Sequence, residues 1–280
     1  MISLKDRAIA GYESHYLEHG WVLVKLPRPE VIQEVRAVLQ DELRKLTGVS
    51  DVTLERYHEI ADDDVLHREY QVKLTEVFRT NRYAYRVLVA QDDFFRPFLG
   101  PDLLVQVNPY LRMARPGKLQ DNIGYHRDTF YGASPYELSV WIPYVDLPAE
   151  SSLSVLSGSH IRPERDFPVT QTQSAEVKKG SDLHKIGFPY APKVMDADPL
   201  ANIQAVPVKA GEALIFSLAT VHGSTLNSGT TARWSTDIRV VNALAPVDLS
   251  ARPDYYETLS SSVVSDRARA YELAERGSRN

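Results

Sequence analysis

The chain has 280 residues, 43% of them hydrophobic and 25% charged, with a formal net charge of −5. These values are ordinary for a soluble globular protein with a sizeable core, and they exclude a general electrostatic attraction to nucleic acid or anionic membranes. There is no cysteine, which excludes disulfides, thiolate metal sites and a cysteine nucleophile. Any metal must therefore be held by histidine, carboxylate and water.

The first hundred residues are predicted to be mainly helical. Apolar residues at helical spacing indicate a helix over 4–17, with Gly20 as its stop, and "WVLVKLP" then indicates a short strand. A second helix is expected over 29–48, because a proline begins it and a glycine closes it. Three consecutive aspartates, Asp62, Asp63 and Asp64, suit a helix N-terminus and predict a third helix over 62–80.

From about Leu103 the pattern changes to short β-rich runs divided by Gly, Pro, Asn and Ser. This texture predicts an antiparallel β-sandwich or barrel core over 103–245. A polar, proline-containing insert at 161–200 interrupts it, and its length favours a functional loop or lid. Residues 264–280 are predicted to form a short helix and a tail. No linker is apparent, so we expect one domain over 1–280.

The targeting signals of a secreted or membrane protein are not visible. The N-terminal stretch lacks the apolar core and cleavage site of a signal peptide, and no apolar run approaches the roughly 18 residues of a membrane span. These features favour a cytoplasmic protein without membrane or nucleic-acid partners.

The stretch "GYHRDTF" places His126 and Asp128 two positions apart in an apolar setting. On an extended strand these side chains project from the same face, and burying them is costly unless something satisfies both. A metal ion would do so. An isolated pair of this kind is, however, more often a surface pair or a core hydrogen bond, so a metal site requires a third ligand.

A third ligand is offered by His222, which ends the alternating run "GEALIFSLATVH" and precedes Gly-Ser. Two histidines and one carboxylate with open positions form the facial triad of non-haem Fe(II) oxygenases, with zinc as the alternative metal. Arg233 follows eleven residues later on the next β-like run, and a guanidinium is the natural bidentate partner of a carboxylate. Arg239, on the same run, is interpreted as an exposed strand arginine.

These motifs, in this order, carry a family resemblance. "YHRD", "VWIPYVDLPAESSLSVLSGSH" and "GEALIFSLATVHGSTLNSGTTARWSTDIRV" resemble the phytanoyl-CoA dioxygenase family of Fe(II)- and 2-oxoglutarate-dependent oxygenases, best from Leu103 to Val241. The resemblance implies a mainly β fold with flanking helices, specifically a distorted double-stranded β-helix (a cupin-like jelly roll). It also implies Fe(II) bound by the catalytic set His126, Asp128 and His222.

The same resemblance implies the cosubstrate contacts and the reaction. Arg233 would pair with the distal carboxylate of 2-oxoglutarate, with the Ser224 hydroxyl beside it. O2 and 2-oxoglutarate would be consumed, succinate and CO2 released, and an unactivated C–H bond of a small molecule hydroxylated, in a biosynthetic or natural-product role. Related halogenases carry a small residue in place of the carboxylate. Asp128 therefore favours hydroxylation, or desaturation and cyclisation, over halogenation.

Several neighbouring residues receive subsidiary predictions. A further 2-oxoglutarate contact is expected from one of three residues before the H-x-D motif: Gln106, Asn108 or Arg112. Three aromatic residues are candidates for the substrate pocket or, equally, for core packing: Tyr125, Phe130 and Tyr131. Arg127 is expected to point away from the site, and His160, which closes "SGSH", to be structural.

Two other hypotheses stay open at this point. One is a cupin-like metalloenzyme, an isomerase or hydrolase, that uses a different metal and no 2-oxoglutarate. The other is a non-catalytic binding module on the same fold. The sequence names neither the substrate nor the oligomeric state.

Overall fold

A computed structural model describes residues 4–170, 192–195, 198–250 and 252–277 of the chain. Most of the predicted lid at 161–200 therefore lies outside the described residues. The helices are α1 (Leu4–His19), α2 (Pro29–Thr47), α3 (Asp64–Thr80), α4 (Tyr83–Val89), α5 (Asp92–Leu99) and α7 (Val263–Gly277). The strands are β1 (Trp21–Lys25), β2 (Leu103–Gln106), β3 (Leu111–Ala114), β4 (Glu137–Pro143), β5 (Ser154–Val155), β6 (Gln204–Ala205), β7 (Glu212–Ser217), β8 (His222–Gly223), β9 (Arg233–Asn242) and β10 (Tyr256–Ser260).

The first three helices begin and end close to where local signals place them. Pro29 opens α2, and Gly48 ends it in the left-handed conformation with φ of 70°. The Asp63 carboxylate accepts hydrogen bonds from the backbone N–H groups of Val65 and Leu66. Asp63 is therefore the N-cap, and α3 begins at Asp64 rather than at Asp62 as the acidic triple suggested.

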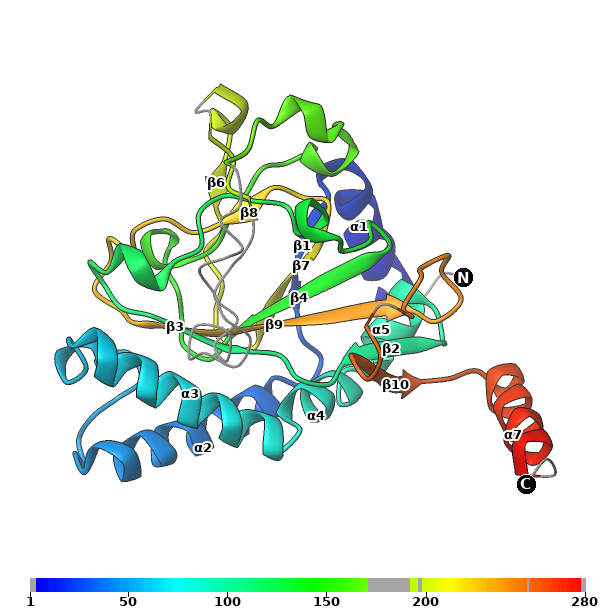
Figure 1. Cartoon of the computed structure of the whole chain (residues 1–280), viewed down its shortest axis with the longest axis horizontal. Helices are drawn as coiled ribbons and strands as arrows, with labels where there is room; N and C mark the ends of the chain where they lie inside the picture. Colours follow the sequence, from blue (N-terminus) through cyan, green and yellow to red (C-terminus); the bar gives the residue numbers. More distant parts are fainter. Residues whose placement is uncertain (1–3, 171–191, 196–197, 251, 278–280) are drawn as a thin grey trace.

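The β core consists of two antiparallel sheets. The larger has seven strands in the order β1-β7-β4-β9-β2-β10, with β3 also paired to β9, and the smaller has the order β6-β5-β8. In Figure 1, α2, α3 and α4 lie along one side of the large sheet, while the small sheet lies on the opposite side of it. The architecture is therefore mainly antiparallel β with flanking helices, as the sequence predicted. Within the described ranges, no helix combines the length and apolar character needed to cross a bilayer.

β9 is the strand that matters most for the site, because it is buried on both faces. The even-numbered side chains from Trp234 to Val240 are fully buried, namely Trp234, Thr236, Ile238 and Val240. The odd-numbered side chains from Arg233 to Arg239 line a cavity on the other face, namely Arg233, Ser235, Asp237 and Arg239. This period of two follows from the pleat of an extended strand.

At the C-terminal end, β10 pairs antiparallel with β2 and completes one edge of the large sheet. α7 then extends away from the body of the molecule (Figure 1). The predicted start of this helix at 264 is one residue from the observed one. The sequence prediction contained no strand at β10.

Candidate metal centre

The backbones of His126 and His222 pair directly. Each backbone N–H donates to the carbonyl of the other residue at 2.9 Å, which makes an antiparallel bridge outside the regular strands. Gly223 permits this approach: its φ is 154°, and an added Cβ would lie 2.7 Å from the carbonyl oxygen of Gly124. The bridge brings the two imidazole centroids to 4.5 Å.

Both imidazoles are held in the tautomer that a metal ligand requires. Nδ1 of His126 lies 2.8 Å from the carbonyl oxygen of Gly124, and Nδ1 of His222 lies 2.9 Å from that of Thr220. Since a carbonyl can only accept, each Nδ1 is the protonated donor and each Nε2 keeps its lone pair. Burial, with the neighbouring His126 adding to it, lowers the pKa of His222 to about 4, so this ring is neutral at physiological pH.

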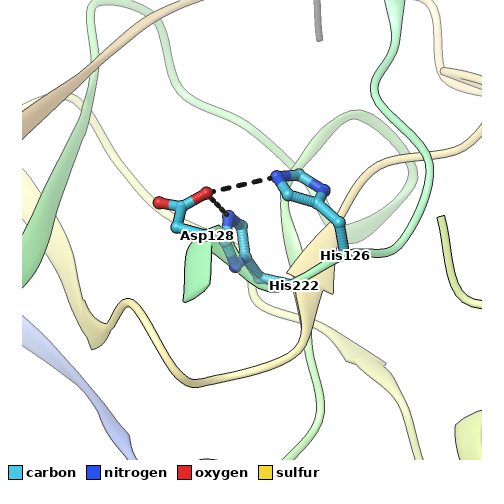
Figure 2. A group of neighbouring side chains, drawn as sticks. All are labelled: His126, Asp128 and His222. Carbon is cyan, nitrogen blue, oxygen red and sulfur yellow. Dashed lines mark ion pairs between the residues drawn. The ribbon is translucent and has the colours of Figure 1, made fainter. Parts of the chain in front are cut away.

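Asp128 brings the carboxylate to the two free imidazole nitrogens. One oxygen, Oδ1, lies 3.4 Å from Nε2 of His126 and 3.8 Å from Nε2 of His222 (Figure 2). Asp128 opens a short 3-10 helix, Asp128–Tyr131, rather than continuing a strand, so the predicted strand geometry is wrong here. The turn still directs the carboxylate toward both rings.

The donor set fits a bound cation. The three ligand atoms lie within 4.8 Å of one another and all three residues are buried. With both ring protons on Nδ1, the two Nε2 lone pairs face a carboxylate oxygen with no hydrogen between them. A cation at their centre would satisfy both Nε2 lone pairs and would also bind Oδ1, which accepts a hydrogen bond from the Tyr131 hydroxyl. Two imidazoles and one carboxylate are the donors of the non-haem Fe(II) facial triad.

Arg239 is the strongest electrostatic neighbour of this group. Its guanidinium pairs with the second oxygen of Asp128, Oδ2, and lies 3.3 Å from a carboxylate oxygen of Asp237. Burial alone would raise the pKa of Asp128, but Arg239 and then the two imidazoles hold that pKa well below its usual range. The sequence interpretation of Arg239 as an exposed arginine is wrong: its side chain is 11% exposed, because odd-numbered residues of β9 face the cavity.

Arg233 and Ser224 meet at a second polar group on the same cavity. Nη2 of Arg233 donates to the side-chain oxygen of Asn122 at 3.1 Å, and the Ser224 hydroxyl donates to the same oxygen at 3.0 Å. Arg233 is 6% exposed, and its Nε has no hydrogen-bond partner among the described residues. Burial, and then repulsion from Arg112, lowers the pKa of Arg233 to about 10, so it stays a cation at neutral pH.

Asn122 is a member of this group that the sequence reasoning missed. It lies in a loop after a 3-10 turn (Leu119–Asp121), and no motif marks it. The only available signal was its position a few residues before the H-x-D pair.

The cavity has a volume of about 760 Å³ and is lined by all three triad residues, Ser224 and Arg233. Apolar side chains of the large sheet contribute Trp141 and Phe216 to its wall. Of the three candidate pocket aromatics, only Tyr131 lines it, and the Tyr131 hydroxyl donates to Asp128.

The other two aromatics, Tyr125 and Phe130, pack instead in a separate apolar cluster with Leu156, Phe167 and Val221. Arg127 points away from the triad, as expected. Its guanidinium donates to the Ser159 carbonyl and lies 4.2 Å from the Phe167 ring centroid.

The three candidates for a further 2-oxoglutarate contact, and His160, lie in different places. Gln106 and Arg112 lie on the wall of the main cavity, whereas Asn108 lines a separate hollow beside α3. His160 lies in a 3-10 turn with Nε2 at 3.2 Å from the carbonyl oxygen of Leu17. This contact agrees with the structural role expected for it.

Comparison with known proteins gives one family match and many structural ones. The family model described as phytanoyl-CoA dioxygenase matches residues 16–235. No curated protein matches the sequence. With the site formed by His126, Asp128 and His222, the family match confirms the expected cofactors, Fe(II) and 2-oxoglutarate.

Among solved structures, the non-heme monooxygenase ThoJ in its apo form is 20% identical, with a TM-score of 0.58 over 90% of this chain and 84% of that one. Its nickel complex is 18% identical, with a TM-score of 0.54 over the same shares. EvdO2 from Micromonospora carbonacea var. aurantiaca, complexed with 2-oxoglutarate, is 15% identical with a TM-score of 0.51, covering 85% of this chain and 94% of that one. At these identities the likeness establishes the fold.

Proposed function

Because this chain belongs to the phytanoyl-CoA dioxygenase family, we propose that it is an Fe(II)- and 2-oxoglutarate-dependent dioxygenase that hydroxylates an unactivated C–H bond of a small molecule. The observation that carries the proposal is the preorganised triad of His126, Asp128 and His222, which shares one cavity with the buried cation Arg233. We also propose that the two sheets form the distorted double-stranded β-helix of this family, within a single domain over 1–280.

The triad residues would hold the metal through two Nε2 atoms and one carboxylate oxygen, with the Nδ1–carbonyl bonds fixing both rings. When bound together, Fe(II) and 2-oxoglutarate supply the activation of O2 and the removal of hydrogen from carbon, with succinate and CO2 as coproducts. The protein contributes placement of the substrate and exclusion of water from the reacting atoms.

Arg233 is assigned the distal carboxylate of 2-oxoglutarate. Its guanidinium is buried and retains an unpartnered Nε among the described residues, so a carboxylate in the cavity can receive a charge-assisted hydrogen bond. Ser224 and Asn122 support Arg233 at this end of the cavity. The side-chain oxygen of Asn122 accepts hydrogen bonds from both the Ser224 hydroxyl and the Arg233 guanidinium. A cavity of about 760 Å³ leaves ample space for a substrate beside the small keto acid.

Asp128 bears on the reaction type. In related halogenases a small residue replaces the carboxylate and leaves a position for chloride; here the carboxylate is present and faces both imidazoles. This supports hydroxylation over halogenation. Product analysis separates hydroxylation from desaturation or ring closure by the same site.

The proposal is tested by adding Fe(II) and 2-oxoglutarate to the purified protein without oxygen. We expect a weak visible charge-transfer band that is absent in His126→Ala and His222→Ala, and succinate formation once O2 is admitted. The absence of both band and succinate would refute the proposal. A protein that retains zinc and consumes no O2 would instead support the cupin-like metalloenzyme.

A further inference from the structure

The two oxygens of Asp128 have different partners. Oδ1 is the oxygen that faces Nε2 of both histidines, and in Figure 2 both dashed lines end at this one atom while the other oxygen points away. Oδ2 is paired with the guanidinium of Arg239. The carboxylate is fully buried, and Oδ1 also accepts a hydrogen bond from the Tyr131 hydroxyl.

Arg239 is itself fixed from several sides. Its backbone N–H donates to the side-chain oxygen of Gln106 at 3.1 Å, at the place where β9 passes from pairing with β3 to pairing with β2. Its guanidinium also lies 3.3 Å from Asp237, on the same face of the strand. One terminal nitrogen of the guanidinium, Nη2, therefore lies between the carboxylates of Asp128 and Asp237.

An arginine beside a cation site needs an explanation, because its charge repels the metal that the site is built to bind. The geometry supplies one. A carboxylate with both oxygens free can chelate a metal and so occupy one more coordination position than a single-oxygen ligand. A facial triad works only if the positions opposite the protein ligands stay open.

Resting on the function proposed above, we infer that Arg239 is a positioning residue that restricts Asp128 to metal binding through Oδ1 alone. By occupying Oδ2, Arg239 keeps open the coordination position that a chelating carboxylate would take. It thereby preserves the places that the keto acid and O2 require. Arg239 contacts the metal ligand Asp128 rather than the reacting atoms, and it acts by limiting the coordination number of the metal.

The test compares Arg239→Met with Arg252→Met in the full-length chain. Arg252 also lines the cavity, but its guanidinium pairs with Glu137 at 2.7 Å and not with Asp128. Co(II) is the metal probe, since its visible spectrum reports coordination number and geometry. 2-Oxoglutarate is then titrated into protein saturated with Fe(II) without oxygen, and the charge-transfer band is followed.

We expect Arg239→Met to bind Co(II) with an altered visible spectrum and to require about tenfold or more 2-oxoglutarate for half-saturation. Arg252→Met should match the wild type in both measurements. A folded Arg239→Met protein with the wild-type spectrum and wild-type 2-oxoglutarate requirement would overturn the inference. Wild-type protein that binds no Co(II) would overturn the proposed function and this inference together.

A second measurement needs no substitution at Arg239, so it can refute the inference even if that variant does not fold. The infrared difference spectrum between Zn(II)-loaded and metal-free wild-type protein contains the carboxylate stretches of Asp128, identified by their loss in Asp128→Asn. A wide separation of the asymmetric and symmetric stretches, typical of a single-oxygen ligand, is expected. A narrow separation, typical of a chelating carboxylate, would refute the inference.

Discussion

Replacing Arg233 with methionine should have opposite effects on the free protein and on 2-oxoglutarate binding. Arg233 is a cation with 6% exposure and an unpartnered Nε among the described residues. Burial, with Arg112 adding repulsion, lowers the pKa of Arg233 from 12.5 to about 10. This shift corresponds to about 3 kcal/mol of destabilisation at neutral pH, offset by about 1 kcal/mol for the hydrogen bond to Asn122.

Arg233→Met should therefore raise the free energy of unfolding of the ligand-free protein by roughly 2 kcal/mol, or its Tm by about 5 °C. The gain should disappear in the presence of ligand. 2-Oxoglutarate at about 100 times its Kd stabilises the wild type by about 2.7 kcal/mol. The variant should lose most of this response at the same 2-oxoglutarate concentration. Removing one partner of a buried charge pair costs about 2–5 kcal/mol, which raises Kd at least about thirtyfold.

The assay is thermal and urea unfolding with and without 2-oxoglutarate, using Mn(II) in place of Fe(II) to prevent turnover. Arg252→Met is the matched control, since it removes the cation paired with the fully buried Glu137 and leaves that carboxylate, among the described residues, only its hydrogen bonds from Ser134 and Tyr256. That control should lower the stability of the ligand-free protein and keep the response to 2-oxoglutarate. If Arg233→Met were less stable than the wild type and still responded fully, our assignment of Arg233 would be wrong.

Three further substitutions test other parts of the structure. Burial lowers the pKa of His67 to about 4, so the folded protein resists a proton that the unfolded chain accepts near 6.5. The free energy of unfolding of the wild type should therefore fall by about 2 kcal/mol from pH 7 to pH 5, measured by urea unfolding. His67→Gln should remove this contribution to the pH dependence, and an equal pH dependence in wild type and variant would contradict the argument. Asn122→Ala should raise the half-saturating 2-oxoglutarate concentration about five- to thirtyfold in the charge-transfer titration. Loss of iron binding instead would show that Asn122 supports the triad. Gly223→Ala should lower Tm and metal affinity together, because its Cβ would lie 2.7 Å from the Gly124 carbonyl oxygen. The control Gly132→Ala, with φ of 96° and open space around its Cβ, carries backbone strain of about 1–3 kcal/mol but should keep the metal affinity.

The parts of the fold that could be predicted are those whose signals are local. Pro29 and Gly48 delimit α2 through backbone conformations that depend only on the residue itself. The three triad residues could be predicted as metal ligands because the H-x-D motif and the later His-Gly-Ser motif, in that order, resemble those of one family. Their meeting at one cavity agrees with that selection.

The parts that could not be predicted depend on contacts between distant segments. The run from Glu212 to His222 was interpreted as one strand, yet β7 ends at Ser217 and His222 belongs to the other sheet. Arg233 and Arg239 lie on the same face of β9 and look alike in sequence. Their roles separate only because Asn122 faces the first and Asp128 the second, and neither pairing leaves a trace in local sequence.

The alternation of side chains along β9 has a consequence for how selectivity can change in this protein. Ser235 and Asp237 lie between the two arginines, on the cavity face and away from the packed face of the strand. Substitution of Ser235 would alter what a substrate meets while Arg233 and Arg239 keep their partners, whereas substitution of Asp237 would also remove a carboxylate that lies 3.3 Å from Arg239. Insertion of a single residue just before Arg233, with the pairing of the strand kept, would do the reverse: it would exchange the two faces and remove both arginines from the cavity. Point substitutions on the cavity face of this strand can therefore change selectivity without moving the two arginines, which a one-residue insertion before them cannot do.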